Sequence, residues 1–82
     1  MEKAEVESRL KKVIARVLKL PEESISSDAN FIFDLGADSM QSMLLVAGFE
    51  EEFEIEMPED QALGVQTVSG AVEFIANIIE KK

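Results

Sequence analysis

The side chains best suited to chemistry in this sequence lie in one short stretch, Asp34-Leu35-Gly36-Ala37-Asp38-Ser39. A glycine-containing turn followed by an acid, a serine and an apolar run of helical length is typical of a loop that enters a helix. A serine can act as a nucleophile, but the chain has no histidine to serve as its base, and every lysine lies near a chain end. Ser39 is therefore predicted to be either a helix N-cap or a residue on which another enzyme acts.

The region around this stretch is also dense in oxygen-bearing side chains of the kind that bind calcium. An EF-hand loop beginning at Asp28 would need an oxygen ligand at its fifth position, glycine at the sixth and glutamate at the twelfth. The sequence has Ile32, Phe33 and Ser39 at these positions. The chain also lacks cysteine, which excludes disulfides and thiolate metal sites. We expect neither a metal site nor catalytic activity.

The 82 residues carry a formal net charge of −9, and this charge is unevenly distributed. Residues 1–19 contain six basic and three acidic residues, whereas residues 20–80 contain fourteen acids and no Lys or Arg. Such a surface repels nucleic acid and attracts basic protein partners. No stretch has the roughly 20 apolar residues of a membrane span, and the N-terminus has no signal-peptide core. We expect a cytoplasmic protein that binds no nucleic acid.

Three main helices are predicted to hold the serine-containing stretch in place, and the first lies in the N-terminal part. Its apolar residues, from Val6 onward, recur at the spacing of one helix face. The helix should end at about Lys19 or Leu20, because the residue before Pro21 is pushed out of the α region. Residues 22–35 are then predicted to form an ordered loop, which some of its apolar side chains attach to the core.

The rest of the chain is predicted to form two further main helices and a short helix between them. The second main helix should run from Asp38 or Ser39 to Phe53. A short helix should start at Pro58, and Thr67 should cap the last helix. No segment alternates as a strand with a second strand to pair with. The sequence therefore predicts an all-α fold, a single domain over residues 1–82 with three main helices plus one short helix before the last.

The second helix carries apolar residues on two faces. One face has core spacing and should point inward; it consists of Ser42, Leu45, Val46, Phe49 and Phe53. A small domain has too few elements to cover the other face, so that face is a candidate docking surface; it consists of Met40, Met43, Leu44 and Ala47. The alternative is that these four residues also belong to the core, where methionine fills gaps well. Gly48 costs about 1 kcal/mol relative to alanine, which indicates a close approach of a neighbouring backbone or a bend.

The stretch from Asp34 to Ser39 resembles the attachment motif of acyl carrier proteins of the fatty-acid type, and the resemblance covers almost the whole chain. It includes the helix that ends at Pro21, the acidic run before Pro58, and the Thr67-Val68 start of the last helix. The resemblance implies that Ser39 receives a covalent 4′-phosphopantetheine arm from coenzyme A, whose thiol holds acyl chains as thioesters. It also implies a small four-helix bundle without catalytic activity of its own.

The resemblance further implies partners and a binding pocket. A freestanding, monomeric carrier would serve a phosphopantetheinyl transferase and acyl-processing enzymes with basic docking patches. The residues that would face these partners are Asp34, Asp38, Met40, Met43, Leu44, Ala47, Glu50 and Glu51. The acyl chain would lie between the inner faces of the helices, against Leu45, Val46, Phe49, Phe53, Val68, Val72 and Ile75; the alternative is that these residues fill an ordinary core. Three successive glutamates at a helix C-terminus oppose its dipole, so local stability does not explain Glu50–Glu52; partner recognition would explain them, and the default alternative is a solvated acidic face.

Some positions depart from the fatty-acid type and leave alternatives open. Gln41 and Leu44 stand where acids are common, and Ala47 replaces a larger apolar residue, so the docking face is less charged. The partners could be housekeeping fatty-acid enzymes or a specialised set, with aminoacyl or polyketide cargo as an alternative. A different hypothesis is an acidic helical interaction module in which Ser39 is only an N-cap. That hypothesis predicts that Ser39→Ala loses about 1 kcal/mol of stability.

Overall fold

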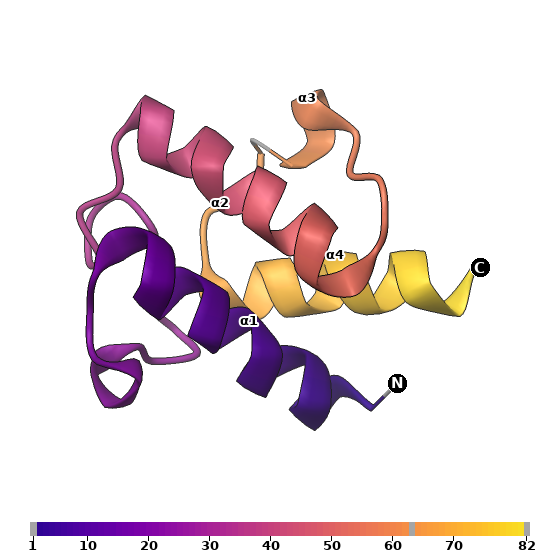
Figure 1. Cartoon of the computed structure of the whole chain (residues 1–82), viewed down its shortest axis with the longest axis horizontal. Helices are drawn as coiled ribbons and strands as arrows, with labels where there is room; N and C mark the ends of the chain where they lie inside the picture. Colours follow the sequence, from indigo (N-terminus) through magenta and orange to yellow (C-terminus); the bar gives the residue numbers. More distant parts are fainter. Residues whose placement is uncertain (1, 63, 82) are drawn as a thin grey trace.

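A computed structural model describes residues 2–62 and 64–81 of the protein (Figure 1). Its elements in chain order are α1 (Lys3–Leu18), a short 3₁₀ helix η1 (Glu22–Ser24), α2 (Ser39–Phe53), α3 (Glu59–Ala62) and α4 (Val68–Glu80). Within these residues no strand occurs; extended backbone pairs only in an isolated antiparallel bridge between Asn30 and Thr67. The predicted all-α fold, with three main helices and a short helix before the last, is confirmed.

Helix α1 provides the centre of the hydrophobic core. Val6, Leu10, Val13 and Ile14 lie on one face of this helix and are each at most 1% exposed. The helix ends at Leu18, and the C-cap residue adopts the left-handed conformation with φ 58° while its N–H donates to the Ala15 carbonyl. Proline follows two residues later, so the helix cannot continue. The predicted helix end is thus confirmed to within a residue or two.

The long connection between α1 and α2 is ordered because hydrogen bonds join it to the start of α4. The Phe31 N–H donates to the Gln66 carbonyl at 2.9 Å, and the Val68 N–H donates to the Ala29 carbonyl at 3.0 Å. Hydrogen bonds from Lys11 and Ser27 lower the pKa of the Glu7 carboxyl, so α1 also contacts this connection. Its apolar contribution to the core comes from Ile25, Ala29, Phe31 and Ala37.

The three main helices do not pack equally against one another. Helix α1 packs against both α2 and α4 (Figure 1). Among the residues described, α2 and α4 contact each other far less than either contacts α1. Gly48 allows the close approach of α2 to α1, because a Cβ atom there would lie 2.8 Å from Val13 Cγ1. The close neighbour predicted for Gly48 therefore exists, but it is a side chain of α1 and not a backbone.

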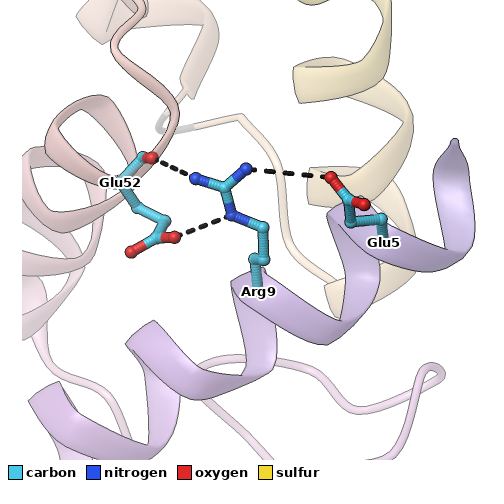
Figure 2. Close-up of polar contacts among 3 residues, drawn as sticks. All are labelled: Glu5, Arg9 and Glu52. Atoms are coloured by element: carbon cyan, nitrogen blue, oxygen red, sulfur yellow. Dashed lines mark hydrogen bonds and ion pairs between the residues drawn. The ribbon is translucent and has the colours of Figure 1, made fainter. Parts of the chain in front are cut away.

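An arginine of α1 binds the C-terminal end of α2 (Figure 2). Arg9 Nε donates to Glu52 Oε2 at 2.7 Å and Arg9 Nη2 donates to the Glu52 carbonyl oxygen at 2.7 Å. The guanidinium carbon also lies 5.0 Å from the centre of the Phe53 ring, and Glu5 lies 3.9 Å from Nη1 on the other side. The last turn of α2 contains no basic residue, so Arg9 supplies the positive charge that this helix end favours.

The acidic end of α2 is thus partly explained by contacts within the protein. Glu52 binds Arg9, and Glu50 Oε2 accepts a hydrogen bond from the Met57 N–H at 2.9 Å. The second contact holds the segment after α2, in which Ile55 and Met57 are buried. Local helix stability does not account for Glu50 and Glu52, because their partners lie outside the helix that carries them, but contacts within the protein do.

Candidate functional site

Helix α2 begins with a capping box that leaves Ser39 out. The N-cap is Asp38, whose carboxylate accepts a hydrogen bond from the Gln41 N–H at 2.8 Å. In return the Gln41 side-chain oxygen accepts from the Asp38 N–H at 3.3 Å. Ser39 is the first residue of the helix proper. The interpretation of Ser39 as an N-cap is therefore wrong, because the preceding carboxylate takes the amide that a capping serine would bind.

The turn before the helix is held by its own polar side chains. Asp34 Oδ2 accepts from the Asn30 N–H at 2.7 Å, and Asn30 Oδ1 accepts from the Ile32 and Phe33 N–H groups at 2.9 Å each. Gly36 adopts a φ of 75°, which disfavours residues with a side chain. Asp34 and Asp38 thus both have structural roles in presenting Ser39, whereas the sequence indicated only recognition by a partner.

The surroundings of Ser39 fit a covalently attached phosphate group. The residue is exposed, and its hydroxyl makes no hydrogen bond within residues 2–62 and 64–81. It lies at the N-terminus of a 15-residue helix, where unpaired backbone amides and the helix dipole favour negative charge. This contribution is typically about 0.3–1 kcal/mol at an exposed position. The N-terminus of α2 therefore offsets part of the repulsion between such a phosphate and Asp38.

A cavity of about 490 Å³ lies beside Ser39. It lies between α2, the connection before α2, the segment around α3 and the start of α4, all of which contribute to its lining. Its lining contains no charged side chain among the residues described and consists of Asn30, Phe31, Ile32, Phe33, Ser39, Ser42, Met43, Leu45, Val46, Phe49, Met57, Ala62, Val65, Gln66 and Ala71. The attachment residue proposed from the sequence and an apolar cavity are therefore adjacent.

The lining of this cavity differs from the pocket expected from the sequence. Leu45, Val46 and Phe49 line it as expected. Four other expected residues do not line it but belong to the buried core that contains the apolar face of α1; they are Phe53, Val68, Val72 and Ile75. The reason is that α1 packs against both α2 and α4 and takes up these inner faces.

The cavity residues that sequence reasoning missed come from three separate segments. The connection before α2 contains an apolar run within an otherwise polar segment, namely Phe31, Ile32 and Phe33. This run could have indicated that the connection contributes to the cavity. Met57, Ala62 and Ala71 have no distinguishing local pattern. They reach the cavity only because α3 and the start of α4 close it, which is a consequence of tertiary packing.

The second apolar stripe of α2 lies on the surface. Met40 is 72% exposed, and Met43, Leu44 and Ala47 are also exposed. The alternative in which these residues belong to the core is therefore wrong. Glu51 is exposed beside this stripe, whereas Glu50 is half-buried by its contact with the Met57 amide. Met40, Met43, Leu44 and Ala47 are called the α2 surface stripe below.

Two further kinds of feature are absent from the described residues. No described helix has the length and apolarity needed to cross a membrane. Within residues 2–62 and 64–81, no group of three or more His, Cys, Asp or Glu residues is arranged to hold a metal ion.

The sequence matches a known family over most of its length. Residues 8–75 match the family model described as the phosphopantetheine attachment site. The matched range contains Ser39, the capping box and every element that lines the cavity. Members of this family carry covalently attached 4′-phosphopantetheine. The chain belongs to the phosphopantetheine-binding carriers, the family of which acyl carrier proteins are an example.

Proposed function

We propose that the protein is an acyl carrier protein of the fatty-acid type that carries its 4′-phosphopantetheine arm on Ser39. The observation that carries this proposal is an exposed serine, at the first residue of α2, that also lines an apolar cavity. An interaction module with a purely structural Ser39 is disfavoured, since Asp38 and not Ser39 caps the helix.

In this proposal Ser39 is a substrate of another enzyme. Its hydroxyl oxygen attacks the pantetheine-side phosphorus of coenzyme A, and the bond to the departing adenosine 3′,5′-bisphosphate breaks. The transferase must provide the base that takes the serine proton, because this chain has no histidine and no lysine or arginine between residues 20 and 80. Once attached, the arm supplies a thiol that holds acyl groups as thioesters. The protein itself contributes position and shelter and no catalysis.

The cavity supports hydrocarbon cargo over aminoacyl cargo. Its described lining is mostly aliphatic, aromatic or methionine, with polar groups limited to Asn30, Ser39, Ser42 and Gln66. An aminoacyl group would bring a charged ammonium, whose burial is unfavourable without a paired carboxylate. No carboxylate lines the cavity in the described part of the chain. A fatty acyl chain makes no such demand, so we assign this class of cargo.

The α2 surface stripe is proposed to dock the partner enzymes. It is bordered by the acids Asp38 and Glu51, and no basic residue follows in the chain until the C-terminal end. Partners with basic patches and an apolar rim, including the phosphopantetheinyl transferase, would match this surface. Asp34 and Glu50 would add negative charge while serving the contacts described above. We propose that the carrier meets these partners as a monomer in the cytoplasm.

Loading by a phosphopantetheinyl transferase tests the proposed function. The purified chain is incubated with coenzyme A and transferase, and its intact mass is measured. We expect a gain of one phosphopantetheine on the wild type and no gain on Ser39→Ala. Ser42→Ala is a matched control, because it removes another hydroxyl from the cavity lining, and it should load. An unmodified wild type, or a gain that persists in Ser39→Ala, would refute the proposal.

A further inference from the structure

The chain itself carries sulfur only in its methionines. It has four methionines and no cysteine, and Met1 lies outside the described residues. Met40 is 72% exposed and Met43 is 55% exposed, whereas Met57 is 8% exposed and belongs to the hydrophobic core. Oxidants reach exposed thioethers first. Met40 and Met43 are therefore the described positions at which an oxidant would modify the folded protein.

Both exposed methionines lie next to Ser39 on α2. Met40 directly follows Ser39, and Met43 comes four residues after Ser39, which places it one helix turn away on the same side. Ser39 and Met43 also line the same cavity. An enzyme that brings coenzyme A to the Ser39 hydroxyl therefore lies against this turn of α2 and covers both thioether side chains.

Met40 and Met43 lie outside the elements that stabilise α2. The helix is capped by Asp38 and Gln41, and its buried residues are Leu45, Gly48, Phe49 and Phe53. A polar group at position 40 or 43 would stay in water in the isolated protein, and the helix would keep its cap and its packing. Oxidation of these two side chains should thus alter the surface of the protein and leave its fold intact.

A sulfoxide changes what this surface can bind. Oxidation converts a flexible apolar methionine into a polar side chain. Water hydrogen-bonds to the sulfoxide oxygen, and burial against an apolar partner surface would leave that oxygen unpaired, which is unfavourable. Leucine would provide a similar apolar contact without this sensitivity, as Leu44 does in the same α2 surface stripe. The two methionines therefore make the surface around Ser39 responsive to oxidants.

We propose that Met40 and Met43 are oxidation sites that reversibly switch off the loading of Ser39. With hydrogen peroxide, the thioether sulfur attacks one peroxide oxygen, the O–O bond breaks, the sulfur loses two electrons to become a sulfoxide, and the peroxide is reduced to water. Methionine sulfoxide reductases reverse this step; a dithiol is oxidised to a disulfide and the oxygen leaves as water. The inference rests on the proposed function, because it requires a transferase that acts on Ser39.

Peroxide treatment followed by loading tests this switch. The unmodified chain is treated with hydrogen peroxide, freed from it, mapped by peptide mass spectrometry and incubated with coenzyme A and a phosphopantetheinyl transferase. The variants are the double substitution Met40→Leu with Met43→Leu and, as a matched control, Met57→Leu, since leucine approximately conserves the volume of methionine. Each loading rate is divided by the rate of the same protein before oxidation, so that any direct effect of a substitution cancels.

In the wild type, we expect Met40 and Met43 to be oxidised about tenfold faster than Met57, because they are far more exposed. Loading of Ser39 should then slow about tenfold, a ratio equivalent to about 1.4 kcal/mol. The two reductases that act on the two sulfoxide epimers should together restore it. The double variant should load at one rate before and after peroxide treatment, whereas Met57→Leu should lose loading as the wild type does.

The possible results separate this inference from the function on which it rests. Failure of the unoxidised wild type to load would refute the proposed function. Equal loading before and after oxidation of both methionines would refute the switch alone. A loss that the double variant shares, or that the reductases do not reverse, would also overturn the switch, because the damage then lies elsewhere. Far-UV circular dichroism of the oxidised wild type should be unchanged, and a lost helical signal would replace the switch by unfolding.

Discussion

At the start of α2, two adjacent side chains have separate tasks. Asp38 accepts a hydrogen bond from the Gln41 N–H and caps the helix, so the Ser39 hydroxyl takes no part in the cap. The carboxylate suits the cap because it accepts hydrogen bonds from amides near the positive end of the helix dipole. Gln41 completes the capping box. Carriers of the fatty-acid type commonly have an acid at the position of Gln41. In this chain the Gln41 amide stands there and still stabilises the start of the helix.

This division predicts opposite outcomes for two neighbouring alanine substitutions. Asp38→Ala should lower the free energy of unfolding by about 1 kcal/mol, because the cap is lost. Ser39→Ala should change it by less than about 0.5 kcal/mol, since alanine is favourable within a helix. Urea denaturation followed by circular dichroism measures both. Asp38→Asn retains a capping oxygen, so its free energy of unfolding should stay close to that of the wild type. A larger loss of stability for Ser39→Ala than for Asp38→Ala would contradict the assignment of the cap.

At the scale of elements, α1 organises the other two main helices through contacts of different kinds. Its apolar face fills the centre of the core, Val13 fits against Gly48 of α2, and Arg9 binds the C-terminal end of α2. Helix α1 packs against both α2 and α4, which contact each other little, and the cavity lies between α2, the start of α4 and the segments that precede and follow α2. The packing of α1 thus determines where a cargo could be held.

The contact between Val13 and Gly48 predicts that the effect of Gly48→Ala on the free energy of unfolding depends on the residue at position 13. In a helix, Gly→Ala is normally stabilising by about 1 kcal/mol, but here the new Cβ would lie 2.8 Å from Val13 Cγ1. Val13 is buried and β-branched, so it cannot easily move away. Overpacking of this kind costs about 1–3 kcal/mol, so Gly48→Ala should be neutral or destabilising in the wild type.

The same substitution should stabilise a protein that already carries Val13→Ala, because the clashing methyl group is gone. Both effects are measured as changes in the free energy of unfolding within each background. Gly48→Ala that stabilises both backgrounds equally would show that the two helices do not meet closely at this point.

The bond between Arg9 and the end of α2 predicts a specific loss of stability. Arg9→Met should lower the free energy of unfolding by about 1–2 kcal/mol, a value reduced from that of a buried charged hydrogen bond because the pair is partly exposed. Two hydrogen bonds and the contact with the Phe53 ring are lost together. Lys12→Met removes an exposed charge of the same helix and should stay within about 0.5 kcal/mol of the wild type. Equal effects of the two substitutions would contradict a special role of Arg9.

At the scale of the whole molecule, charge opposes compactness. The net charge of −9 is confined within extents of 31 × 25 × 19 Å. At about 0.01 M salt the screening length is about 30 Å, so acids on opposite sides still repel each other; at about 0.1 M it falls to about 10 Å. The acids proposed to attract basic partners therefore destabilise the isolated protein at low salt.

This repulsion predicts that salt stabilises the fold. The urea midpoint should rise when NaCl is increased from about 0.01 M to about 0.1 M, since screening weakens repulsion throughout the molecule. A double variant, Glu23→Gln with Glu56→Gln, removes two exposed acids and should show a smaller rise. A midpoint that falls with added salt would mean that ion pairs such as Arg9–Glu52 outweigh the overall repulsion.

The sequence by itself determined the features that depend on local patterns. Helical periodicity, Pro21 and the Thr67 cap predicted the helices, since each of these signals acts within a few residues. The motif around Ser39 could be recognised because its residues are contiguous in the sequence. The two apolar faces of α2 could be predicted because a helix repeats its faces at a fixed spacing. The exposure of the α2 surface stripe agrees with that pattern.

Tertiary structure alone decided which groups meet across the chain. Glu52 finds Arg9 on another helix, and Glu50 reaches the Met57 amide beyond the end of its own. The cavity is lined by Phe33 of the connection and by Ala71 of α4, while Val72 and Ile75 of α4 belong to the core. Periodicity identifies a buried face but not the element that covers it, and here the position of α1 made that choice.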